Sequence, residues 1–143
     1  MLRINLICVG RLRENYWQQA CDEYQKRLTT LCKFTVYEER DDTAIAARLT
    51  KENYGHCVAM CVFGRQTSSE DFANQLASLP LSGQSIVTFI IGGAEGLSEQ
   101  TKTMCHQRIS MSKMTFPHQL ARVLLTEQIY RALSINGGGK YHK

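Results

Sequence analysis

The sequence predicts an α/β domain in which helices flank a mostly parallel sheet. Short apolar runs rich in β-branched residues alternate with longer amphipathic segments along the whole chain. Its 143 residues are enough for one domain with its own core. No interdomain linker and no internal repeat divides the chain. We therefore expect residues 1–143 to form a single domain.

The first part of the chain predicts two strand–helix pairs and a third strand. Residues 2–9 are apolar and β-rich, and Gly10 ends them. Residues 14–32 have the period of an amphipathic helix, with one apolar face: Trp17, Cys21, Tyr24, Leu28. A short strand over 34–38 follows. A second helix over 42–53 is closed by Gly55, and a buried strand over 57–63 is closed by Gly64.

The second part continues the alternation. Ser68 opens a third helix, with Asp71 as the acidic member of a capping box, and this helix is expected to stop before Pro80. Residues 86–91 are expected to form a strand, and Ser98 is expected to cap a helix over 98–107. A brief strand over 109–111 and a long helix that begins at 117 or 118 and runs to 135 complete the expected elements.

The last helix is apolar on nearly all its faces: Leu120, Ala121, Val123, Leu124, Leu125, Ile129, Tyr130, Ala132, Leu133, Ile135. A helix that covers one side of a sheet needs only one apolar stripe. Two arrangements explain the excess. The helix forms a subunit interface, which we favour in so short a chain, or it lies at the centre of a small monomer.

Composition and charge narrow the class of protein. The chain is 43% hydrophobic and 21% charged, which is ordinary for a soluble globular domain, and no run approaches the ~18 apolar residues of a membrane span. The start of the chain lacks a signal-peptide pattern, so we expect a cytoplasmic protein without membrane contact.

The net charge of +4 divides into +5 for residues 104–143 and −1 for the rest. A basic C-terminal third favours a polyanion such as nucleic acid as the partner.

The six cysteines are expected to be reduced and mostly buried, because the chain shows no export signal. His56, Cys57 and Cys61 share one predicted strand and have no second ligand pair nearby. A zinc site is therefore not expected.

The stretch FIIGGAEGLS, residues 89–98, is the first candidate binding segment. Gly92 and Gly93 end a strand, and ligands of open α/β sheets gather beyond the carboxyl ends of strands. Glycine lets a ligand lie against bare peptide, although a tight strand-to-helix turn explains the same residues. No Lys-Ser/Thr pair follows Gly96, and the first strand lacks a GxGxxG sequence, so the two common phosphate loops are excluded. The loop suits a ligand that is bound through backbone groups and apolar contact.

A second irregular segment, residues 112–116, ends at the rigid Pro117. If it lies at the same edge of the sheet, the two loops form two walls of one pocket. The alternative is that Met114 and Phe116 are ordinary core residues.

Several segments resemble the ribosomal RNA large subunit methyltransferase H family of the SPOUT superfamily: FIIGGAEGLS, SMSKMTFPHQLARVLLTEQIYRALSI, the terminal YHK and the opening INLICVGRLRENYWQQACDEYQKRL. The resemblance covers almost the whole chain and is weakest between Arg40 and Glu52, where this chain is shorter than usual. It implies a SPOUT-type domain with a C-terminal trefoil knot, a rare exception among folds, and a homodimer.

The resemblance also implies an activity. The family uses S-adenosylmethionine to methylate N3 of pseudouridine 1915 in helix 69 of 23S rRNA, on assembled ribosomes. By position, the implied cofactor residues are Met60, Gly92, Met111, Ser112, Lys113, Met114, Thr115 and Phe116. Met60 stands where the family commonly has Leu, a substitution of similar volume. Cys61 stands where an acidic residue is usual, so any role of that carboxylate is absent here or has moved.

N3 carries a proton between two carbonyl groups, so a base or cationic donors must assist its attack. The candidates are His142, Tyr141, Arg122, His118 and Lys143. We expect His142 to accept the proton, Tyr141 to stack on a base, and Arg122, Arg131, Lys140 and Lys143 to contact phosphate. Gly137 to Gly139 form a hinge that lets the tail close over the nucleotide. The alternatives are a non-catalytic ribosome- or RNA-binding module of the same fold and a small nucleotide-binding α/β protein.

Overall fold

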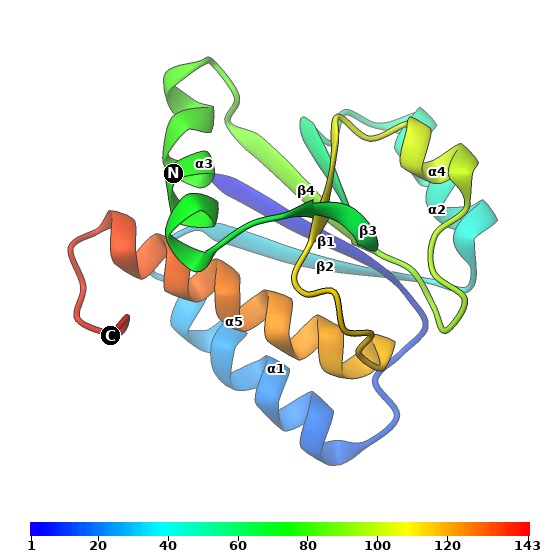
Figure 1. The fold of residues 1–143 in the computed structure, drawn as a ribbon, viewed down its shortest axis with the longest axis horizontal. Helices are drawn as coiled ribbons and strands as arrows, with labels where there is room; N and C mark the ends of the chain where they lie inside the picture. Colours follow the sequence, from blue (N-terminus) through cyan, green and yellow to red (C-terminus); the bar gives the residue numbers. More distant parts are fainter.

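Five parallel strands form one sheet in the order β2-β1-β4-β3-β5 in the computed structural model, which describes residues 1–143 (Figure 1). All four neighbouring pairs are parallel. The strands are β1 Arg3–Val9, β2 Lys33–Glu39, β3 His56–Gln66, β4 Ile86–Ile91 and β5 Gln107–Ser110. Parallel strands need a layer on each face, which explains why β1, β3 and β4 are nearly continuous apolar runs.

The helices divide between the two faces of this sheet: α1 Asn15–Leu28, α2 Asp42–Lys51, α3 Ser69–Leu81, α4 Glu99–Thr103 and α5 His118–Asn136. Side chains alternate along a strand, so Leu6 joins the core beneath α1, α3 and α5, while its neighbour Ile7 joins the smaller core beneath α2 and α4. The predicted α/β class with a parallel sheet is confirmed. The trefoil knot stays a prediction.

Helix α5 lies between α1 and α3 on one face of the sheet (Figure 1). Ile129 is fully buried, and Ala132 and Leu125 are nearly so. Packing within one chain therefore accounts for much of the apolar character that the sequence shows on several faces of this helix. Leu120 and Leu124 remain half-buried, and the subunit interface stays a prediction.

Every predicted element is present, but several ends differ. Strand β3 does not stop at Gly64, because its register against β5 shifts between Met60 and Arg65 and the strand continues to Gln66. A Cβ on Gly64 would lie 2.7 Å from the backbone of Ile109, so glycine is what allows β3 to pass this close to β5.

The helix ends shift for local reasons. Helix α1 ends at Leu28 rather than Cys32, and the chain turns through residues 29–32 toward β2. Helix α3 includes Pro80 in its last turn instead of stopping before it. Helix α4 has only five residues, because His106 already donates its backbone N–H to the Cys57 carbonyl of β3, and β5 begins at Gln107 instead of 109. The Ser68 and Ser98 caps are confirmed, since each side chain accepts a backbone N–H three residues on.

No helix of this structure has the length and apolar character needed to cross a membrane.

Candidate functional site

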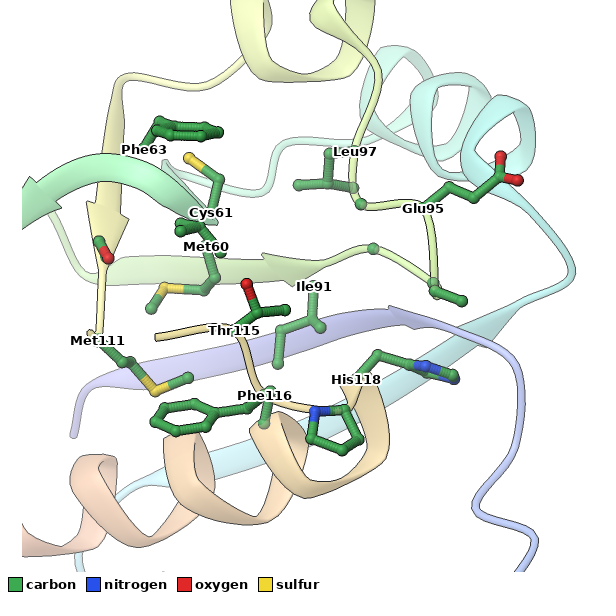
Figure 2. A pocket seen from close by; sticks show the side chains of 18 of the residues that line it. Met60, Cys61, Phe63, Ile91, Glu95, Leu97, Met111, Thr115, Phe116 and His118 are labelled. Carbon is green, nitrogen blue, oxygen red and sulfur yellow. The ribbon is translucent and has the colours of Figure 1, made fainter. Parts of the chain in front are cut away.

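A cavity of about 760 Å³ opens at the carboxyl ends of β4 and β5, beside the middle of β3 (Figure 2). Three segments line it: residues 60–63 at the bend of β3, the loop 91–97 after β4, and the segment 110–118 between β5 and α5, without Lys113. The volume falls within the range of small-molecule sites. The two loops that the sequence suggested as walls of one pocket therefore do meet in one cavity.

The glycine loop is built around a tight turn. Gly96 donates its backbone N–H to the Gly93 carbonyl at 3.0 Å and adopts a φ of +78°. A Cβ on Gly92 would lie only 2.5 Å from the carbonyl carbon of Gly96. Gly92 is buried, Gly93 and Gly96 are more exposed, and all three line the cavity with bare peptide. The sequence left a tight turn and a ligand-binding loop as alternatives. In the structure the same glycines form a tight turn and also line the cavity.

Asp42, at the first position of α2, holds this loop from behind. One carboxylate oxygen accepts the Ser98 backbone N–H at 2.9 Å, and the other accepts the hydroxyls of Ser98 at 2.6 Å and Thr101 at 2.8 Å. Burial opposes ionisation of Asp42, but these hydrogen bonds and the nearby Lys102 together lower its pKa. The carboxylate fastens α4 to α2 and so fixes the far end of the cavity loop.

The second loop is held by its own serines. Ser110 donates its hydroxyl to the Ser112 carbonyl at 2.8 Å, and the Ser112 hydroxyl accepts the Met114 backbone N–H at 3.0 Å. Met114 is 73% exposed, so the alternative in which it is a core residue is wrong. Phe116 and Met111 are half-buried, and Lys113, alone in this run, does not line the cavity.

Apolar and sulfur-containing side chains form the inner surface. Met60, Met111 and Phe116 lie together on one side, with Ile91 behind them and Leu97 opposite (Figure 2). Cys61 and Phe63 lie near the mouth, and Glu95 points away from the cavity (Figure 2). Such a surface suits a ligand that has a flat, largely apolar ring and polar edges. Bare peptide groups can hydrogen-bond the polar edges, and the thioethers can pack on the ring.

His118 is the candidate catalytic residue that the structure places at the cavity. It opens α5, and the next residue ties this end of the helix to the loop after β1. The Gln119 side chain accepts the Arg13 backbone N–H at 3.2 Å and donates to the Arg11 carbonyl at 3.5 Å. His118 therefore has a defined position at the edge of the site.

Arg122 does not reach the cavity, and the expectation that it contacts phosphate is not met. Its side chain is only 5% exposed. It donates to a Glu38 carboxylate oxygen at 2.6 Å and to the Gly10 carbonyl at 2.8 Å. Arg122 thus ties α5 to the carboxyl ends of β1 and β2. The sequence shows that α5 carries this cation but not that the cation points inward.

Tyr141 and His142 lie far from the cavity of their own chain. His142 contacts Arg131, which follows His118 by about 20 Å along α5 at 1.5 Å per residue. The ring of Tyr141 packs edge-on against Tyr130, with centroids 4.8 Å apart, and the Arg131 guanidinium lies 4.8 Å from its centroid. Burial and a hydrogen bond with Tyr24 raise the pKa of Tyr141 to about 12. Gly137 to Gly139 fold the tail back onto α5 and α3.

The sequence does not indicate two residues that hold the cavity loop and the tail in place. Asp42 lies 56 positions before Ser98, and Glu70, which contacts His142, lies 72 positions before it. Both stand in the first turn of a helix, where acidic residues are common for purely local reasons. No spacing rule in the sequence connects either residue to its distant partner.

Known proteins resemble this chain over its full length. A family model described as "Predicted SPOUT methyltransferase" matches residues 2–142. A ribosomal RNA large subunit methyltransferase H from Clostridium novyi is 41% identical over 160 aligned positions, which cover 99% of this chain and all of the relative.

Solved structures share the fold at low sequence identity. A probable methylase family protein from Haemophilus influenzae superposes with a TM-score of 0.58 and 12% identity, over 99% of this chain and 70% of that one. A ribosomal RNA small subunit methyltransferase E from Neisseria gonorrhoeae, bound to S-adenosyl methionine, gives 0.53 and 14%, over 90% and 65% of the two chains.

Proposed function

Because this chain belongs to the family of SPOUT methyltransferases, we propose that its cavity binds S-adenosylmethionine and that it methylates N3 of a pseudouridine in helix 69 of 23S rRNA. The name of its relative from Clostridium novyi supports ribosomal RNA as the substrate class. The single observation that supports the cofactor assignment is the apolar, glycine-walled cavity at the carboxyl edge of a parallel sheet.

Residues from all three segments of the cavity would hold the cofactor: Met60, Gly92, Met111, Ser112, Met114, Thr115, Phe116. Lys113 lies just outside this set. Bare peptide at Gly92, Gly93 and Gly96 fits the polar edges of a nucleoside, and the thioethers and Phe116 fit its ring and sulfur. When bound, S-adenosylmethionine supplies a methyl group activated by a sulfonium. The protein contributes position and exclusion of water, which account for much of the rate of such a displacement.

The tail geometry supports a homodimer. Tyr141 and His142 carry the chemistry expected at the nucleotide, yet they lie about 20 Å along α5 from His118, which lines the cavity of the same chain. A second copy that places its tail over this cavity completes the site without unfolding either tail. In that site His142 accepts the N3 proton, Tyr141 stacks on a base, and Lys140 and Lys143 contact phosphate.

The test is transfer of labelled methyl from S-adenosylmethionine to ribosomes that lack this modification, compared with free 23S rRNA. We expect label in intact ribosomes at one pseudouridine of helix 69. Cofactor binding by calorimetry without label in either substrate would reject the substrate assignment. Absence of cofactor binding, with ribosome binding retained, would instead support a non-catalytic RNA-binding module.

A further inference from the structure

His142 is held between an acid and a guanidinium from two different helices. Its Nε2 lies 2.8 Å from a carboxylate oxygen of Glu70, in the first turn of α3, and its Nδ1 lies 2.9 Å from an Arg131 nitrogen on α5. The other two nitrogens of that guanidinium donate to both carboxylate oxygens of Glu127, at 2.9 and 3.2 Å. The hydrogen bond from His142 lowers the pKa of the Glu70 carboxyl, which keeps it ionised.

These contacts determine which imidazole nitrogen carries the proton. Arginine can only donate, so Nδ1 must accept from Arg131 with its lone pair. The ring proton is then on Nε2, where it is donated to Glu70. Protonation of Nδ1 would set its N–H against an N–H of Arg131. The network therefore selects one tautomer of the His142 imidazole, with the Nδ1 lone pair toward α5.

We propose that Glu70 is a positioning residue for methyl transfer: it fixes the His142 tautomer so that Nδ1 is the lone pair that takes the N3 proton of the substrate. This inference rests on the proposed function, in which His142 is the general base. A carboxylate on one ring nitrogen, opposite the nitrogen that accepts the proton, orients an imidazole and stabilises its charged form. Glu70 would supply both effects from outside the cofactor cavity.

The N3–H of the base replaces the Arg131 N–H at Nδ1 of His142. The N3–H proton passes to Nδ1, the N3 electron pair forms the bond to the methyl carbon, and the electron pair of the breaking carbon–sulfur bond stays on sulfur. His142 becomes an imidazolium paired with Glu70. Arg131, still held by Glu127, is left beside the carbonyl oxygens that flank N3, where a cation stabilises developing negative charge.

Aromatic packing holds the tail in this position before substrate arrives. Tyr141 lies against Tyr130, and the Arg27 guanidinium of α1 lies 6.0 Å from its ring centroid. The charged or titratable groups around His142 are thus Glu70 from α3, Arg131 and Glu127 from α5, and the Tyr24–Tyr141 pair from α1 and the tail. Among these groups, the Glu70 carboxylate accepts the Nε2–H of His142.

The Glu70→Ala and Glu70→Gln variants test the proposal in the ribosome methylation assay. We expect kcat to fall about 100-fold for Glu70→Ala and about 10-fold for Glu70→Gln, which still accepts a hydrogen bond but carries no charge. The KM for ribosomes and the Kd for S-adenosylmethionine should stay within about twofold.

Asp71→Asn is the matched control. Asp71 is exposed, stands beside Glu70 in the same helical turn, and its side chain makes no contact with His142, so we expect wild-type kinetics. A merely structural role for Glu70 would change Kd or KM instead of kcat alone. That result, or a Glu70→Ala variant as active as Asp71→Asn, would overturn the proposal.

A double-mutant cycle with His142→Ala gives a second reading. If Glu70 acts through His142, Glu70→Ala lowers kcat no further once His142 is removed, whereas independent effects multiply. An inactive wild-type protein would reject the proposed function itself. An active wild type in which the two losses multiply would reject only the role of Glu70.

Discussion

At the residue scale, Arg122 shows how burial changes the meaning of a charge. On the sequence it is one of six cations in the basic C-terminal third and a candidate for phosphate contact. In the fold its guanidinium is buried against Glu38 and the Gly10 carbonyl. It therefore acts in stability, by fastening the start of α5 beside the cavity. Lys140 and Lys143 are exposed, and they remain available for the phosphate contacts that we propose.

Replacing Arg122 by methionine should lower the free energy of unfolding by about 2–3 kcal/mol, because Glu38 loses its partner and a buried carbonyl loses its donor. The measurement is urea denaturation. Arg108→Met is the matched control, since Arg108 pairs with Glu99 on the surface and should contribute about 0.5 kcal/mol or less. Equal losses in the two variants would contradict the structural role of Arg122, as would a selective loss of ribosome binding in a fully stable Arg122→Met protein.

At the element scale, the cavity depends on how short helices are fastened together. Helix α4 has five residues, too few to be stable alone, and Asp42 holds it to α2 with three hydrogen bonds. The glycine loop ends at Ser98, the residue that donates two of these bonds to Asp42. The order of the cavity wall is therefore set from outside the cavity.

Replacing Asp42 by alanine should weaken S-adenosylmethionine binding about tenfold, or ~1.4 kcal/mol, because the loop from Gly92 to Ser98 loses its anchor. Calorimetry measures this directly. Asp41→Ala is the control: Asp41 caps the same helix by accepting the Ala44 N–H at 2.8 Å but does not touch α4. It should lower stability by about 1 kcal/mol and leave cofactor affinity unchanged. A parallel loss of affinity in both variants would contradict the anchoring role of Asp42.

At the scale of the whole molecule, the separation of tail and cavity makes a prediction about the dimer. A Gly92→Ala protomer has a damaged cavity, because the added Cβ collides with the backbone of Gly96, and an intact tail. A His142→Ala protomer has an intact cavity and a damaged tail. If each tail serves the partner's cavity, mixing the two variants under conditions of subunit exchange should restore about a quarter of wild-type methyl transfer, since half the dimers are mixed and each has one intact site. A mixture no more active than its components would show that each tail serves its own chain.

Four buried thiols and the half-buried thiol of Cys105 predict how the stability of the whole molecule depends on pH. Burial raises the pKa of Cys8 and Cys105 to about 12, and that of Cys21, Cys32 and Cys57 to about 11, from 9.0. As pH rises above about 9, the unfolded chain releases these protons while the folded protein keeps them, so stability falls toward pH 11.

Urea denaturation at pH 8 and pH 10.5 should show this decline under reducing conditions. The Cys8→Ala variant should show a shallower decline than wild type, although it is less stable at pH 8. A wild-type stability that is constant across this range would contradict the protonated, buried state of these cysteines.

The α/β class, the order of ten elements and two serine caps could be predicted from the residues alone, because these features depend on local periodicity and on residues a few positions apart. The sequence also located both loops of the cavity, since Gly92 marks the end of a strand and Pro117 marks the end of the second loop. The resemblance in those loops and in α5 indicated the family, which the match over residues 2–142 confirmed.

Only the tertiary structure decided what each polar side chain meets. It buried Arg122, placed Met114 in solvent, left Lys113 outside the cavity lining, and set Asp42 and Glu70 against residues 56 and 72 positions away. It also separated the tail from the cavity along the length of α5. The physical reason is that hydrogen bonds and burial depend on distance in space, and packing of the sheet and its helices brings together residues that no local pattern connects.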